Sequence, residues 1–216
     1  MKRMAIFDLD GTILNTLDDL TGAMNHALKL HDFPLKTSQE IEGYLGNGNH
    51  VLVVKACPIG TSDSVIAECE KQFHAYYKEH CYDLTKPYPG IEECLYSLKN
   101  KGMIIGVVSN KADYAVKILV EKFFPGLFDK TVGDQEGYKR KPAIDLVEKV
   151  ANDCGCQLND VYYIGDPSVD VQTAKNGQMD MIAVLWGYQR KSQLEKSGAT
   201  TFANTPEELK ELLLNS

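Results

Sequence analysis

The sequence predicts an α/β protein: a parallel sheet with helices on both faces, and a small all-helical domain inserted after the first strand. Short apolar runs alternate with amphipathic helical patterns along most of the chain, which is typical of βαβ units. Residues 16–85 break this alternation, because they show helical and loop patterns with few strand signals. We therefore expect a core domain formed by 1–15 and 86–216, and a helical domain formed by 16–85.

Apolar runs and helical periodicity place the expected elements in chain order. The strands are expected at residues 4–7, 103–108, 161–164 and 181–185. The helices are expected at 17–30, from Ser38 onward, and at 62–77, 92–101, 114–123, 142–152 and 206–213. Pro142 suits a first helical turn, and Thr205 suits an N-cap. The glycine-rich segment 46–50 predicts a turn, which either only separates two helices or reaches toward a substrate.

Composition and charge narrow the class of protein. The chain has 216 residues, 44% of them hydrophobic, and a formal net charge of -7. This negative field disfavours nucleic acid and anionic membrane as partners, although a bound cation can still attract a small anionic substrate. The six cysteines show no metal-binding spacing and predict reduced thiols. We expect a cytoplasmic protein, as a monomer or a homodimer, with no membrane span.

The most informative stretch is the end of the first expected strand. Asp8, Asp10 and Gly11 follow an apolar run directly, and side chains two residues apart in an extended segment point to the same side. Two carboxylates there can hold a hard cation, or one can act as a nucleophile while the other transfers a proton. The alternative is that these residues form only a polar turn.

Polar residues also follow two later strands. Ser109 and Asn110 come after the second expected strand, and Asp166 and Asp170 come after the third. Because ligands bind at the carboxyl ends of parallel strands, we expect all these side chains to meet at one edge. The sequence has no GxSxG motif that would make Ser109 a hydrolase nucleophile.

Phosphoryl transfer fits this set of side chains. Asp8 would be the nucleophile, and Asp10 would protonate the leaving oxygen and later activate water. Mg²⁺ needs oxygen ligands, which the carboxylates of Asp8 and Asp166 and the carbonyl of Asp10 would supply. Asp170 would hold a metal-bound water. Ser109 and Lys141 would stabilise charge on the phosphoryl oxygens, with backbone N–H groups around Gly11.

These motifs together resemble the haloacid dehalogenase superfamily of Mg²⁺-dependent phosphatases. The residues that carry the resemblance are Asp8-Leu9-Asp10-Gly11-Thr12, Ser109-Asn110, Lys141-Pro142 and Gly165-Asp166 with Asp170. The resemblance implies a Rossmann-like core, a helical cap and a phosphate-binding set of Gly11, Thr12, Ser109, Asn110 and Lys141. Asn15, Ile144 and Pro167 depart from the family pattern, but they remove no catalytic atom.

Within the superfamily, the chain most resembles phosphoglycolate phosphatases, through residues 45–53 and 186–188 and the helix from Pro206. We expect a phosphatase for a small phosphomonoester, with 2-phosphoglycolate the best candidate, acting through an aspartyl-phosphate on Asp8. The alternatives are a mutase of the β-phosphoglucomutase type, a broad-specificity sugar-phosphate phosphatase, and a non-catalytic binding protein of the same fold.

Overall fold

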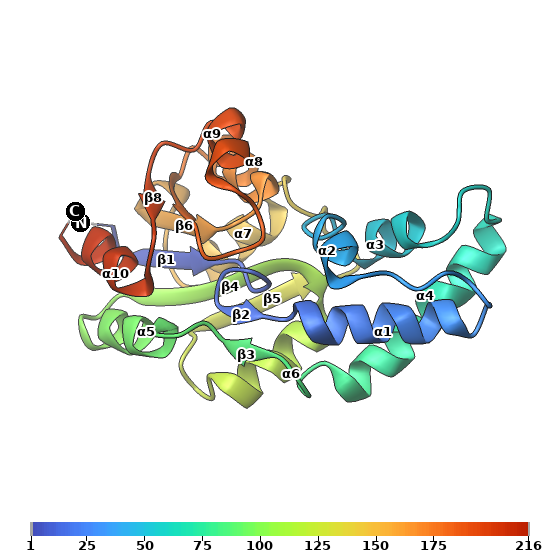
Figure 1. The fold of residues 1–216 in the computed structure, drawn as a ribbon. Helices are drawn as coiled ribbons and strands as arrows, with labels where there is room; N and C mark the ends of the chain where they lie inside the picture. The colour runs from blue at the N-terminus through green and yellow to red at the C-terminus, as the bar shows by residue number, and fades with distance from the viewer. Residues whose placement is uncertain (1, 216) are drawn as a thin grey trace. The chain divides into compact units, whose positions relative to one another are not determined.

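The computed structural model describes residues 2–215. These residues form two compact units (Figure 1). One unit, the sheet unit, contains the chain up to Asn15 together with the chain from Pro87 onward. The other, the helical unit, is Thr16–Lys86.

A six-stranded parallel sheet forms the centre of the sheet unit, with the strand order β5-β4-β1-β6-β7-β8. The strands are β1 (Met4–Phe7), β4 (Ile104–Ala112), β5 (Lys130–Asp134), β6 (Val161–Gly165), β7 (Asp180–Val184) and β8 (Phe202–Ala203). Met4 pairs in register with Ile104 on one side and with Val161 on the other. Because all the strands run parallel, their carboxyl ends lie at the same edge, as the predicted α/β fold requires.

Helices cover both faces of this sheet (Figure 1). One face carries α7 (Asp145–Asp153) and α8 (Ser168–Asn176), and the other carries α5 (Ile91–Asn100) and α6 (Asp113–Phe123). Helix α10 (Pro206–Leu214) packs on α5, and α9 (Lys191–Ser197) packs on α8. Buried side chains of β1, β6 and α7, among them Ile6, Tyr163 and Val150, form one continuous apolar core.

The helical unit contains α1 (Leu17–Lys29), α2 (Ser38–Glu42), α3 (Asn49–Ala56) and α4 (Asp63–His80). Helix α1 packs along α4, whose Phe73 and Tyr77 are buried and stacked 5.5 Å apart. The buried carboxylate of Asp19 accepts the backbone N–H groups of Leu84 and Thr85. Helix α1 therefore fixes residues 84–85, which lie next to the C-terminal end of the helical unit. Two short linker strands, β2 (Leu14–Asn15) and β3 (Lys86–Pro87), pair with each other.

Several elements differ from the sequence predictions. Strand β4 continues to Ala112 instead of ending at Val108, so Ser109 and Asn110 lie within the strand. The helix predicted to start at Pro142 starts at Asp145, because a turn from Arg140 to Ala143 comes first. Four elements, β5, β8, α3 and α9, lie outside the sequence predictions, because they are short and their apolar residues follow no clear period.

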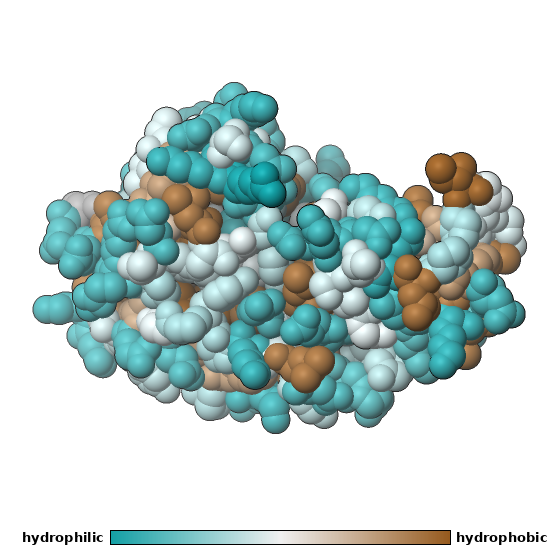
Figure 2. All heavy atoms as spheres, in the orientation of Figure 1, coloured by the Kyte–Doolittle hydropathy of each residue, from teal (hydrophilic) through white to brown (hydrophobic). Residues whose placement is uncertain are grey.

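Hydrophilic residues dominate the face drawn in Figure 2, and apolar residues appear there as separate patches. Among residues 2–215, no helix is both long enough and apolar enough to cross a lipid bilayer. The six cysteines are free thiols.

Candidate active site

Two neighbouring strands deliver the central carboxylates. Asp8 follows β1 and Asp166 follows β6, and both side chains are buried at the carboxyl edge of the sheet. The N–H of Asp8 donates to the carbonyl of Ile164 at 2.8 Å, which extends the pairing of the two strands to the site. The predicted convergence of these aspartates is therefore present in the fold.

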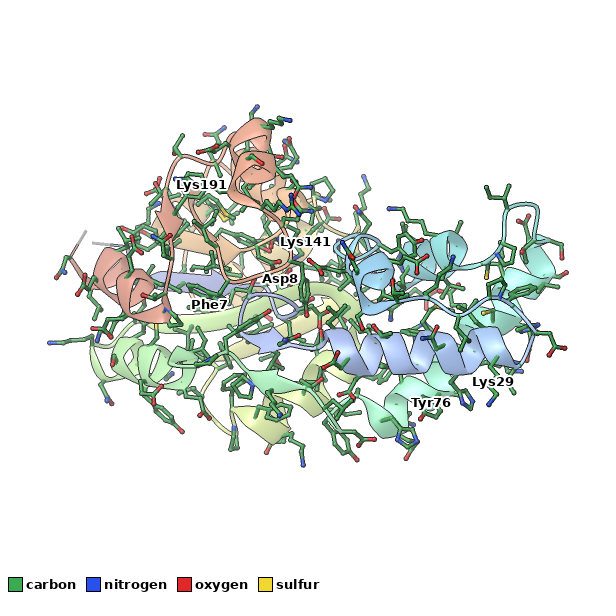
Figure 3. All side chains as sticks on the ribbon, viewed as in Figure 1. Phe7, Asp8, Lys29, Tyr76, Lys141 and Lys191 are labelled. Atoms are coloured by element: carbon green, nitrogen blue, oxygen red, sulfur yellow. The ribbon has the colours of Figure 1, made fainter. Side chains whose placement is uncertain are left out.

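Lys141 lies between two carboxylates (Figure 3 labels it beside Asp8). Its Nζ is 3.0 Å from Oδ1 of Asp8 and 2.7 Å from Oδ1 of Asp170, and its side chain is only 1% exposed. Oδ1 of Asp8 also accepts the N–H of Leu9 at 2.7 Å. Because both donors hold the same oxygen, they fix the orientation of the whole carboxylate.

Asp166 is held by two hydrogen bonds. The hydroxyl of Thr12 donates to Oδ1 at 2.9 Å, and the N–H of Tyr188 donates to Oδ2 at 2.8 Å. The indole N–H of Trp186 donates to the carbonyl of Thr12 at 2.9 Å, so the loop after β7 supports the first loop. A Cβ atom at Gly11 would collide with the Asp166 carboxylate, which explains a glycine at this position.

Asn110 positions Lys141 through its backbone. Its amide donates to the Lys141 carbonyl at 3.1 Å and accepts the Lys141 N–H at 2.8 Å. The hydroxyl of Thr12 is also used within the site, in its hydrogen bond to Asp166. The predicted contacts of Gly11, Thr12, Ser109 and Asn110 with phosphate remain predictions, since the hydrogen bonds seen here are internal to the site.

Sequence reasoning missed Lys111. Its Nζ lies 3.0 Å and 3.2 Å from the two carboxylate oxygens of Asp10, and its side chain is 1% exposed. A lysine in a strand of mixed polarity gives no local signal of burial. The only local hint is that Lys111 directly follows Ser109 and Asn110 at the end of an apolar run.

The donor set fits Mg²⁺. One oxygen from each of Asp8, Asp166 and Asp170 lies within 4.8 Å of the others, and all three residues are buried. Oδ2 of Asp170 has no hydrogen-bond partner in the described chain, as expected for an atom awaiting a ligand. Three carboxylate oxygens are suitable ligands for a hard divalent cation. The Asp10 carboxylate pairs with Lys111 instead, so Asp10 would contribute only its predicted carbonyl.

The three buried carboxylates of Asp8, Asp166 and Asp170 lie near one buried ammonium group, that of Lys141. Burial, followed by the Asp8 charge, raises the pKa of Asp166 to about 7. The same two causes raise the pKa of Asp170. Burial alone would lower the pKa of Lys141, but Asp170 and Asp8 outweigh it and raise that pKa, so the ammonium stays charged. Full ionisation of the three carboxylates would exceed the single positive charge of Lys141, and a bound cation would relieve that excess.

Metal-free protein should lose stability as pH rises toward 7. The pKa of Asp166 is about 7 in the fold and about 3.9 in an unfolded chain. The folded state therefore holds a proton that the unfolded state releases in this range, which lowers the free energy of unfolding by up to about 4 kcal/mol. Urea denaturation in EDTA between pH 5 and 7.5 measures this slope.

Mg²⁺ should reverse this dependence, because it favours the ionised carboxylate. We expect Mg²⁺ to bind more weakly as pH falls below the Asp166 pKa, with fluorescence of Trp186, the chain's one tryptophan, as the readout. The control is Asp166→Asn, which should remove most of the pH dependence of the free energy of unfolding measured in EDTA. An equal slope in both proteins would assign the effect to other groups.

A parallel sheet that gathers carboxylates and a buried lysine at its carboxyl edge is the architecture of an α/β enzyme acting on a small ligand. The family model for haloacid dehalogenase-like hydrolases matches residues 5–184, and the chain belongs to this family. This confirms the family and the fold class predicted from the sequence.

Similar proteins include phosphatases with different substrates in their names. A phosphoglycolate phosphatase of Aquifex aeolicus is 31% identical over 86% of both chains. An N-acetylmuramic acid 6-phosphate phosphatase of Pseudomonas aeruginosa is 26% identical over 99% of this chain and 97% of its own. The crystal structure of a proposed phosphoglycolate phosphatase from Lactobacillus delbrueckii subsp. bulgaricus superposes with a TM-score of 0.94, at 36% identity and full coverage of both chains.

Proposed function

We propose that this hydrolase is a Mg²⁺-dependent phosphatase that cleaves a small phosphomonoester, with 2-phosphoglycolate as the best candidate. The observation that carries the proposal is the fixed carboxylate of Asp8, held 3.0 Å from Lys141 beside Asp166 and Asp170. The phosphoglycolate phosphatases among the relatives support the choice of substrate.

The reaction follows from the roles of these side chains. Asp8 attacks phosphorus, the bond from phosphorus to the ester oxygen breaks, and Asp10 gives that oxygen a proton. Water then attacks the aspartyl-phosphate while Asp10 accepts its proton, which releases phosphate and restores Asp8. Lys141 and Ser109 stabilise charge on the phosphoryl oxygens. Mg²⁺, held by Asp8, Asp166 and Asp170 with the Asp10 carbonyl, would neutralise negative charge on nucleophile and phosphate.

The helical unit, Thr16–Lys86, belongs to the proposal as a cap that selects the substrate. Gly46 and Gly48 both have positive φ angles, and Gly48 precedes α3 directly. This turn and Tyr44 are the candidates for contacting the organic part of the ester. We place the hinges of the cap at residues 14–16 and 85–88, next to the paired linkers.

N-acetylmuramic acid 6-phosphate is the second candidate substrate, because a relative that aligns with 99% of this chain carries that activity in its name. In both candidates the phosphate is esterified to a primary carbon, so the bond that breaks is of the same kind. Both molecules also carry a carboxylate. The two differ in the size of the remaining molecule, which the cap would have to admit.

The test is Mg²⁺-dependent phosphate release from 2-phosphoglycolate, N-acetylmuramic acid 6-phosphate, glucose 1-phosphate and p-nitrophenyl phosphate, with Asp8→Asn protein as the blank. We expect kcat/KM for 2-phosphoglycolate to exceed the other values by at least about 10-fold. Preference for the larger sugar would support the second candidate, and equal values would indicate a broad phosphatase. Isomerisation of glucose 1-phosphate would indicate a mutase, and inactivity on every ester would favour a binding protein.

A further inference from the structure

Strand β4 leaves its regular pairing just where it enters the site. Val108 pairs with Val132 and Ala112 pairs with Asp134, so four steps along β4 match two steps along β5. Two extra residues are therefore accommodated in β4. In a regular strand, Asn110 would point to the opposite face from Ser109 and Lys111. Here all three side chains are buried, and those of Asn110 and Lys111 bond to other loops of the same site.

Gly133 on β5 makes room for this irregularity. A Cβ atom at Gly133 would lie 2.5 Å from the carbonyl oxygen of Lys111 and 2.6 Å from Cα of Asp113. Backbone atoms cannot move away as a flexible side chain would, so any larger residue at this position would displace Lys111. The N–H of Gly133 also donates to Asp113 at 2.9 Å, which ties the start of α6 to β5.

The irregular segment brings Lys111 against the partly exposed Asp10. Both carboxylate oxygens of Asp10 lie within 3.2 Å of Nζ, while the exposed fraction of the side chain is 1% for Lys111 and 20% for Asp10. Lysine is rarely buried this fully unless it is paired. The rigid partner of this pair is therefore the lysine, and the side chain that it restrains is Asp10.

We propose that Lys111 is a positioning residue that holds the Asp10 carboxyl group in place for proton transfer to the ester oxygen and from water. The inference rests on the proposed phosphatase function and extends it, since it explains how the acid–base group is aimed. Lys141 contacts a different pair of carboxylates, those of Asp8 and Asp170, so Lys111 has a separate task. The two buried lysines thus serve the two halves of the reaction, phosphoryl transfer and proton transfer.

The leaving group of the substrate separates this role from a structural one. Nitrophenolate leaves without a proton, whereas the alkoxide of an alkyl phosphate needs one from Asp10. Because kcat/KM reports the steps up to cleavage of the ester bond, Lys111→Met should lower it about 100-fold for 2-phosphoglycolate. For p-nitrophenyl phosphate the loss should stay below about 5-fold. Lys117→Met, which removes an ion-paired lysine whose side chain is 62% exposed on α6, is the matched control and should leave both values unchanged.

A double-mutant cycle adds an independent test that also covers poor folding of the single variant. Asp10→Asn with Lys111→Met removes both charges of the pair, so neither is left unpaired at the site. Once Asp10 is gone, Lys111→Met should cause less than about 2-fold further loss, because the two side chains act as one unit.

Three results would overturn the inference. An equal loss on both esters would assign Lys111 to substrate binding or to folding, and additive losses in the cycle would show that it acts apart from Asp10. In either case, wild-type activity that depends on Asp8 would leave the proposed function standing. Wild-type protein that hydrolyses none of the four phosphate esters named above would overturn the proposed function itself, and the inference with it.

Discussion

Asp8→Asn protein should release phosphate at least about 10³-fold more slowly than wild type, on every substrate that the wild type cleaves. The substitution keeps the size of the side chain and its contact with the Leu9 N–H. It removes the charged oxygen that attacks phosphorus, and no neighbouring carboxylate can take over. Asp166 is bonded to Thr12 and Tyr188, and Asp170 is bonded to Lys141. The measurement is phosphate release with Mg²⁺ under single-turnover conditions.

A second variant separates the position of the carboxylate from its charge. Asp8→Glu retains the charge but moves it by one methylene, which should also abolish turnover because attack requires an accurate approach to phosphorus. Asp18→Asn, at an exposed position in the first turn of α1, is the control and should be fully active. Wild-type protein quenched during turnover should carry labelled phosphate, and Asp8→Asn protein should not. Label on the Asn variant would assign the nucleophile elsewhere.

Local patterns predicted the main strands and the position of Asp8 and Asp166 at the strand ends; their catalytic and metal-binding roles remain predictions. Residues 4–7 and 161–164 are apolar runs of strand length, and both form fully buried strands. A buried strand followed at once by Asp8 or Asp166 fixes where that side chain must lie, because the parallel fold brings strand ends together. This part of the site depends only on sequence neighbours and on the general architecture.

The interactions that position the site could not be predicted in the same way. Asn110 bonds to the backbone of a residue 31 positions away, and Lys111 pairs with one 101 positions away. Both residues lie where β4 pairs irregularly with β5, and a Cβ atom at Gly133 would collide with the backbone of that segment. Strand β5 gives no strand signal in the sequence, because Val132 is the only apolar residue among its five and leaves no alternation to detect.

Lys141→Met should destabilise the metal-free protein by about 3–5 kcal/mol, since it leaves buried carboxylates without their cation. Methionine fills a similar volume, so the loss comes from charge and not from a cavity. The loss should shrink toward acidic pH, where Asp166 takes up a proton below its pKa of about 7. Urea denaturation in EDTA measures the difference. Lys149→Met, which breaks a solvent-exposed ion pair with Asp153, is the control and should leave the stability nearly unchanged.

Mg²⁺ and a second substitution distinguish this electrostatic effect from a general packing defect. Saturating Mg²⁺ should restore most of the lost stability of Lys141→Met, because the ion supplies the missing positive charge. Adding Asp170→Asn should restore it without metal, because one of the two carboxylates that contact Lys141 is then neutral. Neither rescue should restore turnover, which needs the ammonium at the phosphoryl oxygens and should stay about 10²–10³-fold low. A variant that regained stability and activity together would show that Lys141 only supports the fold, whereas stability without activity would separate its two roles.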